Sequence, residues 1–369
     1  MRYELVANIA DIQTGPFGSQ LHKEDYVENG TPIVTVEHLG QRIFTTQNLP
    51  KVSDMDKKRL KKYVLQKGDI VFSRVGSVDR CSYVDKWHDG WMFSGRCLRI
   101  RPYDLVEPLF LYYAFCLEKT KQYIRNIAVG ATMPSINTKL LGEVEVPLPP
   151  LDTQQRITKT LSAIDDKIEL NQKINENLER QAQAIYESIF VTNDNPEWKW
   201  GHLSDLIVVK YGKDHKKLAD GIYPVFGSGG IMRYVERPLY DKESVLIPRK
   251  GTLDNVIYVN EPFWSVDTMF YTVMKLPNIA KFVYHFVKLK DLASLNTGSA
   301  VPSMTTDILN AMELAIPDKD TLAKFENLIS PAYLAMEENN RQSKKLSAIR
   351  DTLLPKLMAG EIDVSNVQL

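Results

Sequence analysis

Two short segments of the sequence carry residue types that enzymes use in catalysis. Asp165-Asp166-Lys167 has the spacing of a nuclease metal site, in which carboxylates bind a divalent cation. The segment from Phe226 to Gly230 is rich in glycine, as phosphate-binding loops are, but it matches neither GxxxxGK(S/T) nor GxGxxG. The acidic segment lies in a long polar stretch with helical spacing, without the strand and upstream acid of a metal site. We therefore interpret it as a solvated helix face, and the glycine segment as a tight turn.

The other residues that commonly act in catalysis are scattered. The sequence contains no asparagine-proline-proline-aromatic tetrapeptide, which amino-methyltransferases use, and no GxSxG nucleophile motif. No two histidines have metal-ligand spacing, and the cysteines contain no CxxC pair. We therefore expect no metal site. We expect the histidines to have surface or packing roles and the cysteines to be buried thiols. These residues are His22, His38, His88, His202, His215 and His285, and Cys81, Cys97 and Cys116.

The length and composition indicate a folded protein of more than one domain. The chain has 369 residues, of which 44% are hydrophobic and 25% are charged. At about 150 residues per domain, this length predicts two or three domains. The longest apolar run, Leu109 to Leu117, is about half as long as a membrane helix. Because the first residues also lack the apolar core of a signal peptide, we expect a cytoplasmic protein.

The charges of the chain balance, with 46 Lys+Arg against 46 Asp+Glu. Proteins that bind nucleic acid through phosphate contacts are usually basic. Contact with a polyanion must therefore come from local clusters, and lysines gather at Lys57 to Lys62 and at Lys210 to Lys217. An ordinary solvated surface is the alternative interpretation of each cluster.

An internal repeat organises the chain into two halves. The segment Gly130 to Pro149 aligns with Gly298 to Pro317 at a constant offset of 168 residues. Upstream, Phe72 to Ser77 aligns with Ile247 to Thr252 at an offset of 175, which pairs one arginine and one glycine of each half. Loops of different length explain the changed offset. Each half thus follows one plan, in which short β-rich runs broken by glycine and proline precede a long polar segment.

The long polar segment of each half has the spacing of a coiled-coil helix. In the first, seam residues follow one another at alternating intervals of four and three from Ile157 to Ile189. In the second, the spacing recurs from Phe325 to Leu357, where the helix either begins near Pro331 or is kinked there. A helix with one apolar stripe needs a partner, so we expect an antiparallel pair. The predicted seam residues are Ile157, Leu161, Ile168, Asn171, Asn175, Leu178, Ala182, Ile185, Ala332, Met336, Asn339, Leu346 and Leu353.

An antiparallel pair about a common centre also predicts a register, in which the numbers of facing residues sum to 514. Asn175 then faces Asn339, and Asn171 faces Ser343. Such a central polar layer sets the register of a coiled coil. Arg350 also falls on the seam, and we expect it to lay its stem along the helix with its charged end in solvent.

These observations predict a fold of the α/β (α+β) class. Two similar globular domains are expected, separated by two long helices that form an antiparallel coiled coil with pseudo-twofold symmetry. The predicted boundaries are 1–147 for the first domain, 148–192 for the first helix, 193–318 for the second domain, 319–360 for the second helix and 361–369 for a C-terminal tail. Strands are predicted at 32–36, 69–72, 244–247 and 256–259, and a short helix around each of Tyr113 and Tyr284.

Several motifs occur in a repeated order along the chain. The first half contains GPFGS (Gly15 to Ser19), GATMPSIN (Gly130 to Asn137), VPLPPLDTQQRI (Val146 to Ile157) and LNQKINENLERQAQAIYESIF (Leu170 to Phe190). The second half contains YPVFGSGGI (Tyr223 to Ile231), TGSAVPSM (Thr297 to Met304) and the segment Ile349 to Ile362. In this order, and over almost its whole length, the chain resembles the specificity subunit of type I restriction-modification systems.

The resemblance implies a non-catalytic subunit with two target recognition domains, each reading one half of a bipartite, asymmetric DNA sequence. The two helices would set the gap between the half-sites and dock two modification subunits, which bring S-adenosylmethionine and methylate adenine. Two restriction subunits, with ATP and Mg²⁺, can join such a complex. The chain itself would bind no cofactor. A net charge of zero fits this interpretation, because partner subunits can supply phosphate contacts.

Polar side chains on the glycine-containing turns after strands are the candidates for base contact, because hydrogen-bond donors and acceptors read base edges in the major groove. With one residue of the second lysine cluster, the candidates are Ser73, Arg74, Ser77, Arg249, Lys250, Thr252 and Lys213. The alternative is that the turn is only structural and its arginine forms an intradomain salt bridge. Two other functions stay open. One is a non-enzymatic coiled-coil scaffold without DNA specificity, and the other is a single-chain methyltransferase or nuclease, whose motifs are absent from the sequence.

Overall fold

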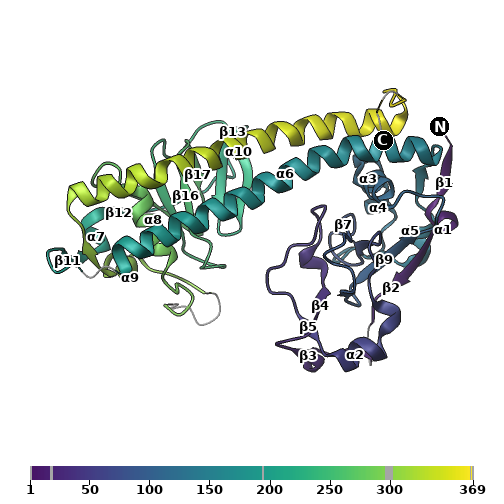
Figure 1. Ribbon diagram of the computed structural model, residues 1–369, viewed down its shortest axis with the longest axis horizontal. Coiled ribbons are helices and arrows are strands. Elements are labelled where there is room, and N and C mark those ends of the chain that lie inside the picture. Colours follow the sequence, from purple (N-terminus) through teal and green to yellow (C-terminus); the bar gives the residue numbers. More distant parts are fainter. Residues whose placement is uncertain (1, 17–19, 193–194, 296–301, 366, 368–369) are drawn as a thin grey trace. The chain divides into compact units, whose positions relative to one another are not determined.

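The structure is a computed structural model that describes residues 2–16, 20–192, 195–295, 302–365 and 367 (Figure 1). Two of the motifs therefore lie partly outside the described residues, namely 17–19 of GPFGS and 297–301 of TGSAVPSM. The chain forms two compact units. Unit 1 comprises residues 1–171 and 341–369, and unit 2 comprises residues 172–340. Each unit contains a globular head and one stretch of each of two long helices.

The head of unit 1, residues 3–147, contains two sheets and a two-stranded ribbon. Its strands are β1 (Tyr3–Leu5), β2 (Ala10–Thr14), β3 (Tyr26–Val27), β4 (Thr31–Val34), β5 (Lys51–Val52), β6 (Ile70–Ser73), β7 (Cys81–Tyr83), β8 (Met92–Phe93), β9 (Cys97–Pro102) and β10 (Glu145–Pro147). Its helices are α1 (Val6–Ile9), α2 (Asp54–Arg59), α3 (Pro108–Cys116), α4 (Glu118–Ile127) and α5 (Thr138–Gly142), with 3-10 turns at Lys23–Asp25, Val36–His38 and Lys61–Tyr63. The central sheet has the order β2-β9-β6-β7, the small sheet has the order β3-β5-β4-β8, and β1 pairs with β10.

The head of unit 2, residues 199–316, has the same kinds of element. Its strands are β11 (Lys199–His202), β12 (Ile207–Tyr211), β13 (Asp220–Gly227), β14 (Gly230–Val235), β15 (Ser244–Pro248), β16 (Ile257–Val259), β17 (Trp264–Ser265), β18 (Met269–Met274) and β19 (Glu313–Ile316). Its helices are α7 (Leu203–Leu206), α8 (Ala280–Lys288) and α9 (Thr306–Asn310). The central sheet has the order β12-β18-β15-β16, the small sheet has the order β14-β13-β17, and β11 pairs with β19.

The sequence repeat is a repeat of structure. Both central sheets are four-stranded and antiparallel, and their strands follow the same order along the chain. The N-caps of α5 and α9 also correspond at the offset of 168. Asn137 accepts a hydrogen bond from the backbone of Leu140 at 2.9 Å, and Thr305 accepts one from Ile308 at 3.3 Å, which satisfies an amide of each first turn. The four predicted strands match β4, β6, β15 and β16, and the two predicted short helices match α3 and α8.

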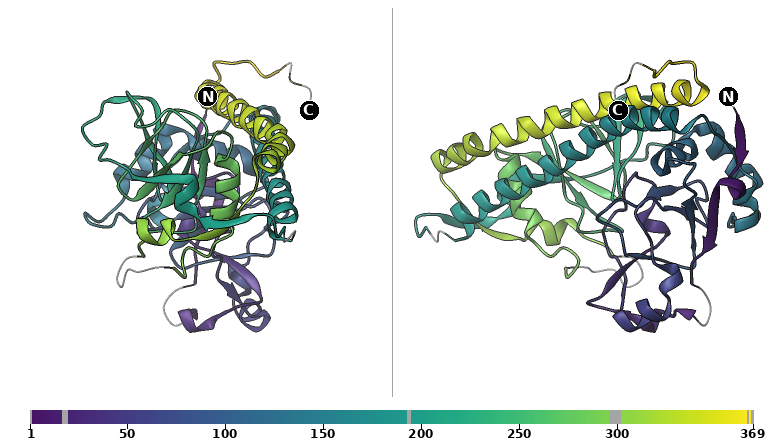
Figure 2. Two further views of the ribbon diagram at one scale, coloured as in Figure 1. Left: turned by 90° about the vertical axis from the view of Figure 1, so that its left-hand side faces the viewer. Right: turned by 45° about the vertical axis from the view of Figure 1, so that its right-hand side comes forward.

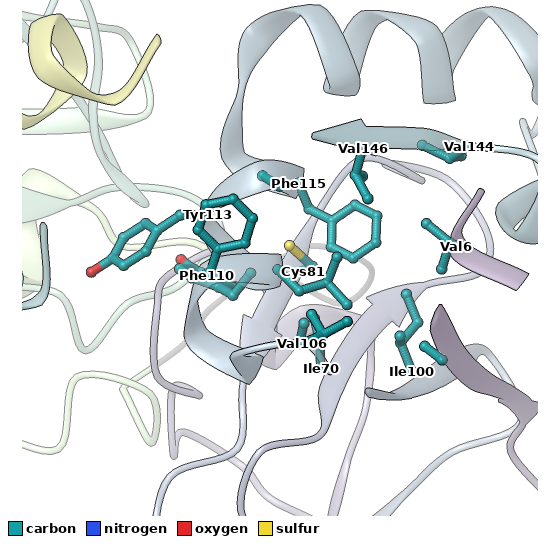
Figure 3. Packing of buried hydrophobic residues seen from close by; sticks show 14 of the residues in the cluster. Val6, Ile70, Cys81, Ile100, Val106, Phe110, Tyr113, Phe115, Val144 and Val146 are labelled. Carbon is teal, nitrogen blue, oxygen red and sulfur yellow. The ribbon is translucent and has the colours of Figure 1, made fainter. Parts of the chain in front are cut away.

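The core of unit 1 lies between the central sheet and α3 (Figure 3). Phe110 and Phe115 of α3 are fully buried in one cluster with Ile70 of β6 and Ile100 of β9. Each buried phenylalanine contributes about 1.5–3 kcal/mol by leaving water. The cluster extends to the ends of both long helices in this unit. Tyr113 lies at the edge of the group shown, with its hydroxyl pointing away from it (Figure 3).

The core of unit 2 is built in the same way. Phe282 of α8 is buried in one cluster with Val245 of β15 and Phe270 of β18. Phe325 and Ile329, from a long helix, belong to the same cluster. Each head is therefore packed on its own stretch of the long helices, and each unit has its own apolar core.

The long helices are α6 (Leu151–Tyr186), which continues into a π-helical turn (Glu187–Val191), and α10 (Lys319–Ala359). Within each unit α10 runs antiparallel beside α6 (Figures 1 and 2). Of the two alternatives for Pro331, a helix that begins there is excluded, because α10 begins well before this residue and continues through it. In unit 1, Ile157 and Leu161 share an apolar cluster with Leu357.

Polar pairs join the two helices near the middle of each. In unit 1, Asn171 donates a hydrogen bond to the hydroxyl of Ser343 at 3.1 Å. In unit 2, Asn339 donates one to the side-chain oxygen of Asn175 at 2.8 Å, and Asn175 donates to Asn340 at 2.8 Å. The pairs of 171 with 343 and of 175 with 339 are those that the register sum of 514 predicts.

The C-terminal tail packs on unit 1. Val364 is buried in the core of this unit. Arg156, near the start of α6, donates a hydrogen bond from Nη1 to the carbonyl of Ser365 at 2.9 Å. The tail therefore covers the end of the unit at which α6 begins.

Candidate nucleic-acid interface

In unit 1, the turn after β6 carries the predicted arginine and glycine. Backbone hydrogen bonds to other segments of the head hold this turn in place. The amide of Arg74 donates to the carbonyl of Arg96 at 2.8 Å, and the amide of Gly76 donates to the carbonyl of Pro134 at 2.8 Å. The carbonyl of Arg74 in turn accepts from the amide of Ile136 at 2.9 Å. Two motifs that are far apart in the sequence, Phe72 to Ser77 and GATMPSIN, therefore meet at this turn, which we call the arginine–glycine turn.

In unit 2, the turn after β15 is held by the same three bonds. The amide of Arg249 donates to Thr268 at 2.8 Å, the amide of Gly251 donates to Pro302 at 3.2 Å, and the amide of Met304 donates to Arg249 at 2.9 Å. Gly76 and Gly251 have φ angles of +76° and +87°, a conformation that glycine adopts without a Cβ clash. The arginine–glycine turn is thus a repeated piece of architecture.

Each arginine side chain is fixed by a main-chain carbonyl. Nη1 of Arg74 donates to the carbonyl of Gly95 at 3.2 Å, and Nη1 of Arg249 donates to the equivalent carbonyl of Asp267 at 2.9 Å. The guanidinium of Arg249 also lies 5.2 Å from the ring centre of Tyr211, a cation–π contact. These bonds support the alternative interpretation, a structural arginine, and in each of them the acceptor is a main-chain carbonyl.

The other candidates for base contact differ in exposure. Ser73 is 1% exposed, and its hydroxyl donates to the carbonyl of Val75 at 2.8 Å. The expectation that Ser73 contacts DNA is therefore wrong for this structure, because the side chain supports the turn from inside. The remaining candidates are exposed: Ser77, Lys213, Lys250 and Thr252.

A second pair of equivalent glycines, Gly15 and Gly212, lies ahead of the small sheets, with one glycine in each head. Gly15 donates its amide to the carbonyl of Cys97 at 3.1 Å, and Gly212 donates to Met269 at 3.1 Å. A Cβ added at either position would lie about 2 Å from a carbonyl oxygen, 2.1 Å in one case and 2.0 Å in the other, so only glycine fits. Gly212 does not stand out in the sequence as the counterpart of Gly15, because the two segments share only this glycine.

In unit 1, a buried carboxylate joins the head to both long helices. Asp165, 5% exposed, accepts hydrogen bonds from the hydroxyl of Tyr113 at 2.7 Å and from Nη1 of Arg350 at 2.8 Å. Burial, with the charge of Asp165, raises the pKa of Tyr113. The interpretation of residues 165–167 as a solvated helix face is therefore wrong at Asp165. The charged end of Arg350 was expected in solvent, but it is only partly exposed, because Nη1 pairs with Asp165 while Nε and Nη2 bond the exposed Asp351.

A second contact joins the head of unit 1 to α6 through one arginine. Arg42 donates from Nε to Glu169 at 2.6 Å and from Nη2 to Asp166 at 2.5 Å. Its side chain is 12% exposed, and these two carboxylates raise its pKa. Because Arg42 belongs to a loop of the small-sheet region, this loop is tied to the helix.

In unit 2, the corresponding junction is centred on a buried histidine. Nδ1 of His285 lies 2.7 Å from the side-chain oxygen of Gln183, and its Nε2 lies 2.9 Å from the hydroxyl of Tyr333. Burial lowers the pKa of His285 to about 4, so the ring is neutral at pH 7. Beside it, Tyr284 donates to Glu179. His285 has the packing role that the sequence analysis expected of its histidines.

The predicted seam residues are buried or half-buried along α6 and α10. Leu161, Asn171, Ala182 and Ile157 are buried. The others are half-buried: Ile168, Asn175, Leu178, Ile185, Ala332, Met336, Asn339, Leu346 and Leu353. Among the described residues, no group of three or more histidine, cysteine, aspartate or glutamate side chains could hold a metal ion. No helix within the described ranges is long and apolar enough to cross a membrane.

The sequence matches the type I restriction modification DNA specificity domain over residues 6–180 and 195–330. The chain belongs to the type I restriction-modification specificity subunits. It is 26% identical to the MjaIX specificity subunit of Methanocaldococcus jannaschii, covering 73% of this chain and 72% of that protein. It is 23% identical to the HindI specificity subunit of Haemophilus influenzae, covering 82% and 88% of the two chains. A crystal structure of a type I specificity subunit from M. genitalium has the same fold, with a TM-score of 0.54, 17% identity and coverage of 96% and 95%.

As a specificity subunit, the chain recognises DNA with two target recognition domains, and it acts within a type I restriction-modification complex. Subunits of this family are non-catalytic and bind no cofactor, and the catalytic activities belong to the modification and restriction subunits. The interpretations as a scaffold without DNA specificity and as a single-chain enzyme are thereby excluded.

Proposed function

We propose that each head of this specificity subunit reads one half of a bipartite, asymmetric DNA target. Residues 1–147 form the first target recognition domain and residues 193–318 the second. The arginine–glycine turn carries the proposal, because the same three backbone bonds build it in both units. Each unit also has its own core, so each head can act as a separate reader. The exposed side chains differ between the turns, Ser77 in one and Lys250 and Thr252 in the other, which allows two different half-sites.

In this proposal the two arginines approach DNA from a fixed position. The carbonyl bond of each guanidinium restricts its orientation, which favours the planar, two-point contact that arginine makes with guanine. Ser77, Thr252 and Lys250 flank the arginines and contact bases or phosphates. Lys213 adds a phosphate contact, whose contribution to affinity falls as salt concentration rises.

We further propose that α6 and α10 set the gap between the half-sites and dock two modification subunits, which bring S-adenosylmethionine. Restriction subunits with ATP and Mg²⁺ join this complex in the cytoplasm. The central polar pairs support a ruler of constant length, since a slipped register would leave amides unpaired at about 1–3 kcal/mol each.

A domain exchange tests the assignment of the half-sites. The chain is expressed with its modification subunit in a host without other methylation, and the methylated sequence is read by long-read sequencing. Replacing residues 1–147 by the first domain of another family member should change one half of the sequence and leave the other half and the gap intact.

The reciprocal exchange of residues 193–318 is the matched control and should change only the other half. A change in both halves after either exchange would contradict separate readers. Native mass spectrometry of the purified complex tests the partners, for which we expect two modification subunits per chain. A single modification subunit would contradict that part of the proposal.

A further inference from the structure

The two heads share a scaffold but differ in their small sheets. Both central sheets are four-stranded with the same strand order, whereas the small sheet is β3-β5-β4-β8 in unit 1 and β14-β13-β17 in unit 2. A scaffold that is the same in both copies cannot by itself select two different sequences. We therefore expect the residues that distinguish one half-site from the other in the elements that differ between the heads.

In unit 2, the differing element is a β-hairpin with exposed apolar side chains. On β13 and β14, Ile222 is 77% exposed, Ile231 is 46% exposed and Met232 is 60% exposed. The pairing shifts between Val225 and Phe226, which leaves Met232 without an opposite residue, as in a β-bulge. Bulges redirect a side chain away from the regular sheet. Ile231 and Met232 are neighbours near the tip of the hairpin, and adjacent exposed apolar side chains on a ribbon are suited to contact with another molecule.

The tip of this hairpin lies against the arginine–glycine turn. Asn255, which follows the turn, donates from its side chain to the carbonyl of Ser228 at 2.8 Å. A Cβ on Gly251 would lie 3.0 Å from the hydroxyl of Ser228. The hairpin and the turn that carries Arg249 are therefore neighbouring parts of one surface in unit 2.

The loop that precedes the hairpin is attached to the same small sheet. The indole nitrogen of Trp264, on β17, donates to the carbonyl of Lys213 at 2.9 Å, and β17 pairs with β13. Residues 210–237 contain six Lys+Arg and three Asp+Glu, whereas the rest of 193–318 contains eight and twelve. The segment that holds the hairpin and the loop before it therefore has a net charge of +3, whereas the rest of the domain has a net charge of −4. A positive segment fits a polyanion better than a neutral protein surface.

We propose that the β13–β14 hairpin reads a thymine in the second half-site through apolar contact of Met232 and Ile231 with its 5-methyl group. The major groove of DNA is wide enough for a two-stranded ribbon. Neither side chain offers a strong hydrogen-bond donor or acceptor, and the thymine methyl is the apolar group that base edges present in that groove. This inference rests on the proposed reading of DNA by the second domain.

Deoxyuridine tests the contact directly, because it differs from thymidine only by the methyl group. The complex of this chain with its modification subunits is assayed on duplexes that carry the methylated sequence. Each thymine of the second half-site, on either strand, is replaced in turn by uracil. We expect a severalfold loss of affinity at one or two positions, and Met232→Ala should abolish the difference between thymine and uracil there.

Met55→Ala is the matched control, since Met55 is 76% exposed on unit 1, and it should leave the discrimination in the second half-site unchanged. Ile231→Ala is the second variant, and it should weaken the same discrimination. A second half-site without an A·T pair, or uracil duplexes bound as tightly as the parent, would overturn the inference. The inference would also be overturned by a Met232→Ala chain that no longer binds modification subunits but still discriminates uracil from thymine, because the hairpin would then be a protein contact. If the exchange of residues 193–318 changes one half-site while these variants change nothing, only this inference fails.

Discussion

Arg350 of α10 and Asp165 of α6 form a hydrogen-bonded ion pair within unit 1, with 2.8 Å between Nη1 and Oδ1. Asp165 is almost fully buried and also accepts a hydrogen bond from the hydroxyl of Tyr113, on α3. One carboxylate therefore connects the head to both long helices. Removing it leaves a partly buried guanidinium and a buried hydroxyl without this acceptor.

Asp165→Ala should lower the free energy of unfolding of the chain by about 2 kcal/mol, because the buried hydroxyl of Tyr113 loses its acceptor and Arg350 keeps only its pair with Asp351. Urea unfolding followed by circular dichroism measures the loss. Asp152→Ala is the control, since this aspartate is exposed on the same helix and pairs with Arg156, and it should cost much less because water screens an exposed ion pair. If both substitutions lower the free energy of unfolding equally, the burial of Asp165 does not increase its contribution to stability.

The register of the helix pair can be tested by crosslinking in unit 2. With Cys81, Cys97 and Cys116 replaced by alanine, cysteines at Ala182 and Ala332 should form a disulfide efficiently, because their numbers sum to 514 as do those of the bonded asparagines. The yield is measured by non-reducing electrophoresis after mild oxidation.

The control for the crosslink pairs a cysteine at Ala182 with one at Asn339, one heptad away. This pair should crosslink poorly. If it bridges better than the pair at 182 and 332, the helices are shifted by one heptad and the polar pairs are not the ones described.

Arg74 and Arg249 are expected to contribute to DNA binding by the assembled complex. If Arg74 contacts a base, Arg74→Ala should cost about 1–3 kcal/mol in affinity for the specific duplex and relax one position of one half-site. A phosphate contact would instead weaken all sequences alike and lower the salt dependence by about one ion. Fluorescence anisotropy at several salt concentrations separates these results, and Arg249→Ala should act on the other half-site.

Arg96→Ala is the matched control for Arg74. Arg96 is exposed and supports the turn through its main-chain carbonyl, so the loss of its side chain leaves the turn intact and should have a smaller effect. Unchanged affinity of a folded Arg74→Ala chain would remove Arg74 from the interface and leave it a structural role.

His285 should make the stability of unit 2 depend on pH. Burial lowers its pKa from 6.5 to about 4, so in this range the unfolded chain binds a proton that the folded chain does not. Stability is therefore complete above pH 6.5 and is lost as pH falls toward 4. At pH 5 the expected loss from this group is about 2 kcal/mol. Urea unfolding at pH 7.5 and pH 5 measures it.

The contribution of His285 is isolated by His285→Gln, which should lose about 2 kcal/mol less than the parent chain between these pH values. His22→Gln, at an exposed histidine, is the control for removing a histidine from the chain by the same substitution. A His285→Gln chain with the same pH dependence as the parent would mean that the ring is protonated without unfolding.

Features that depend on spacing along the chain could be predicted from the amino-acid sequence. The offset of 168 between the halves reappears in the N-caps Asn137 and Thr305. The alternating intervals of four and three place Asn171 and Asn175 on one stripe of a helix, because helical periodicity is a local property. The register followed from the same spacing, since a slipped register would bury the asparagine amides unpaired.

The burial of polar side chains and their contacts depend on packing between distant segments and could not be predicted from the sequence. Asp165 has the sequence context of a solvated helix face, yet α3 covers it and provides Tyr113. Ser73 and Ser77 lie on the same turn, but one points into the core and the other to the surface. The bulge that exposes Met232 depends on how β14 pairs with β13. Such contacts join residues that are distant in sequence, and their burial is set by what packs against a face, which no local pattern records.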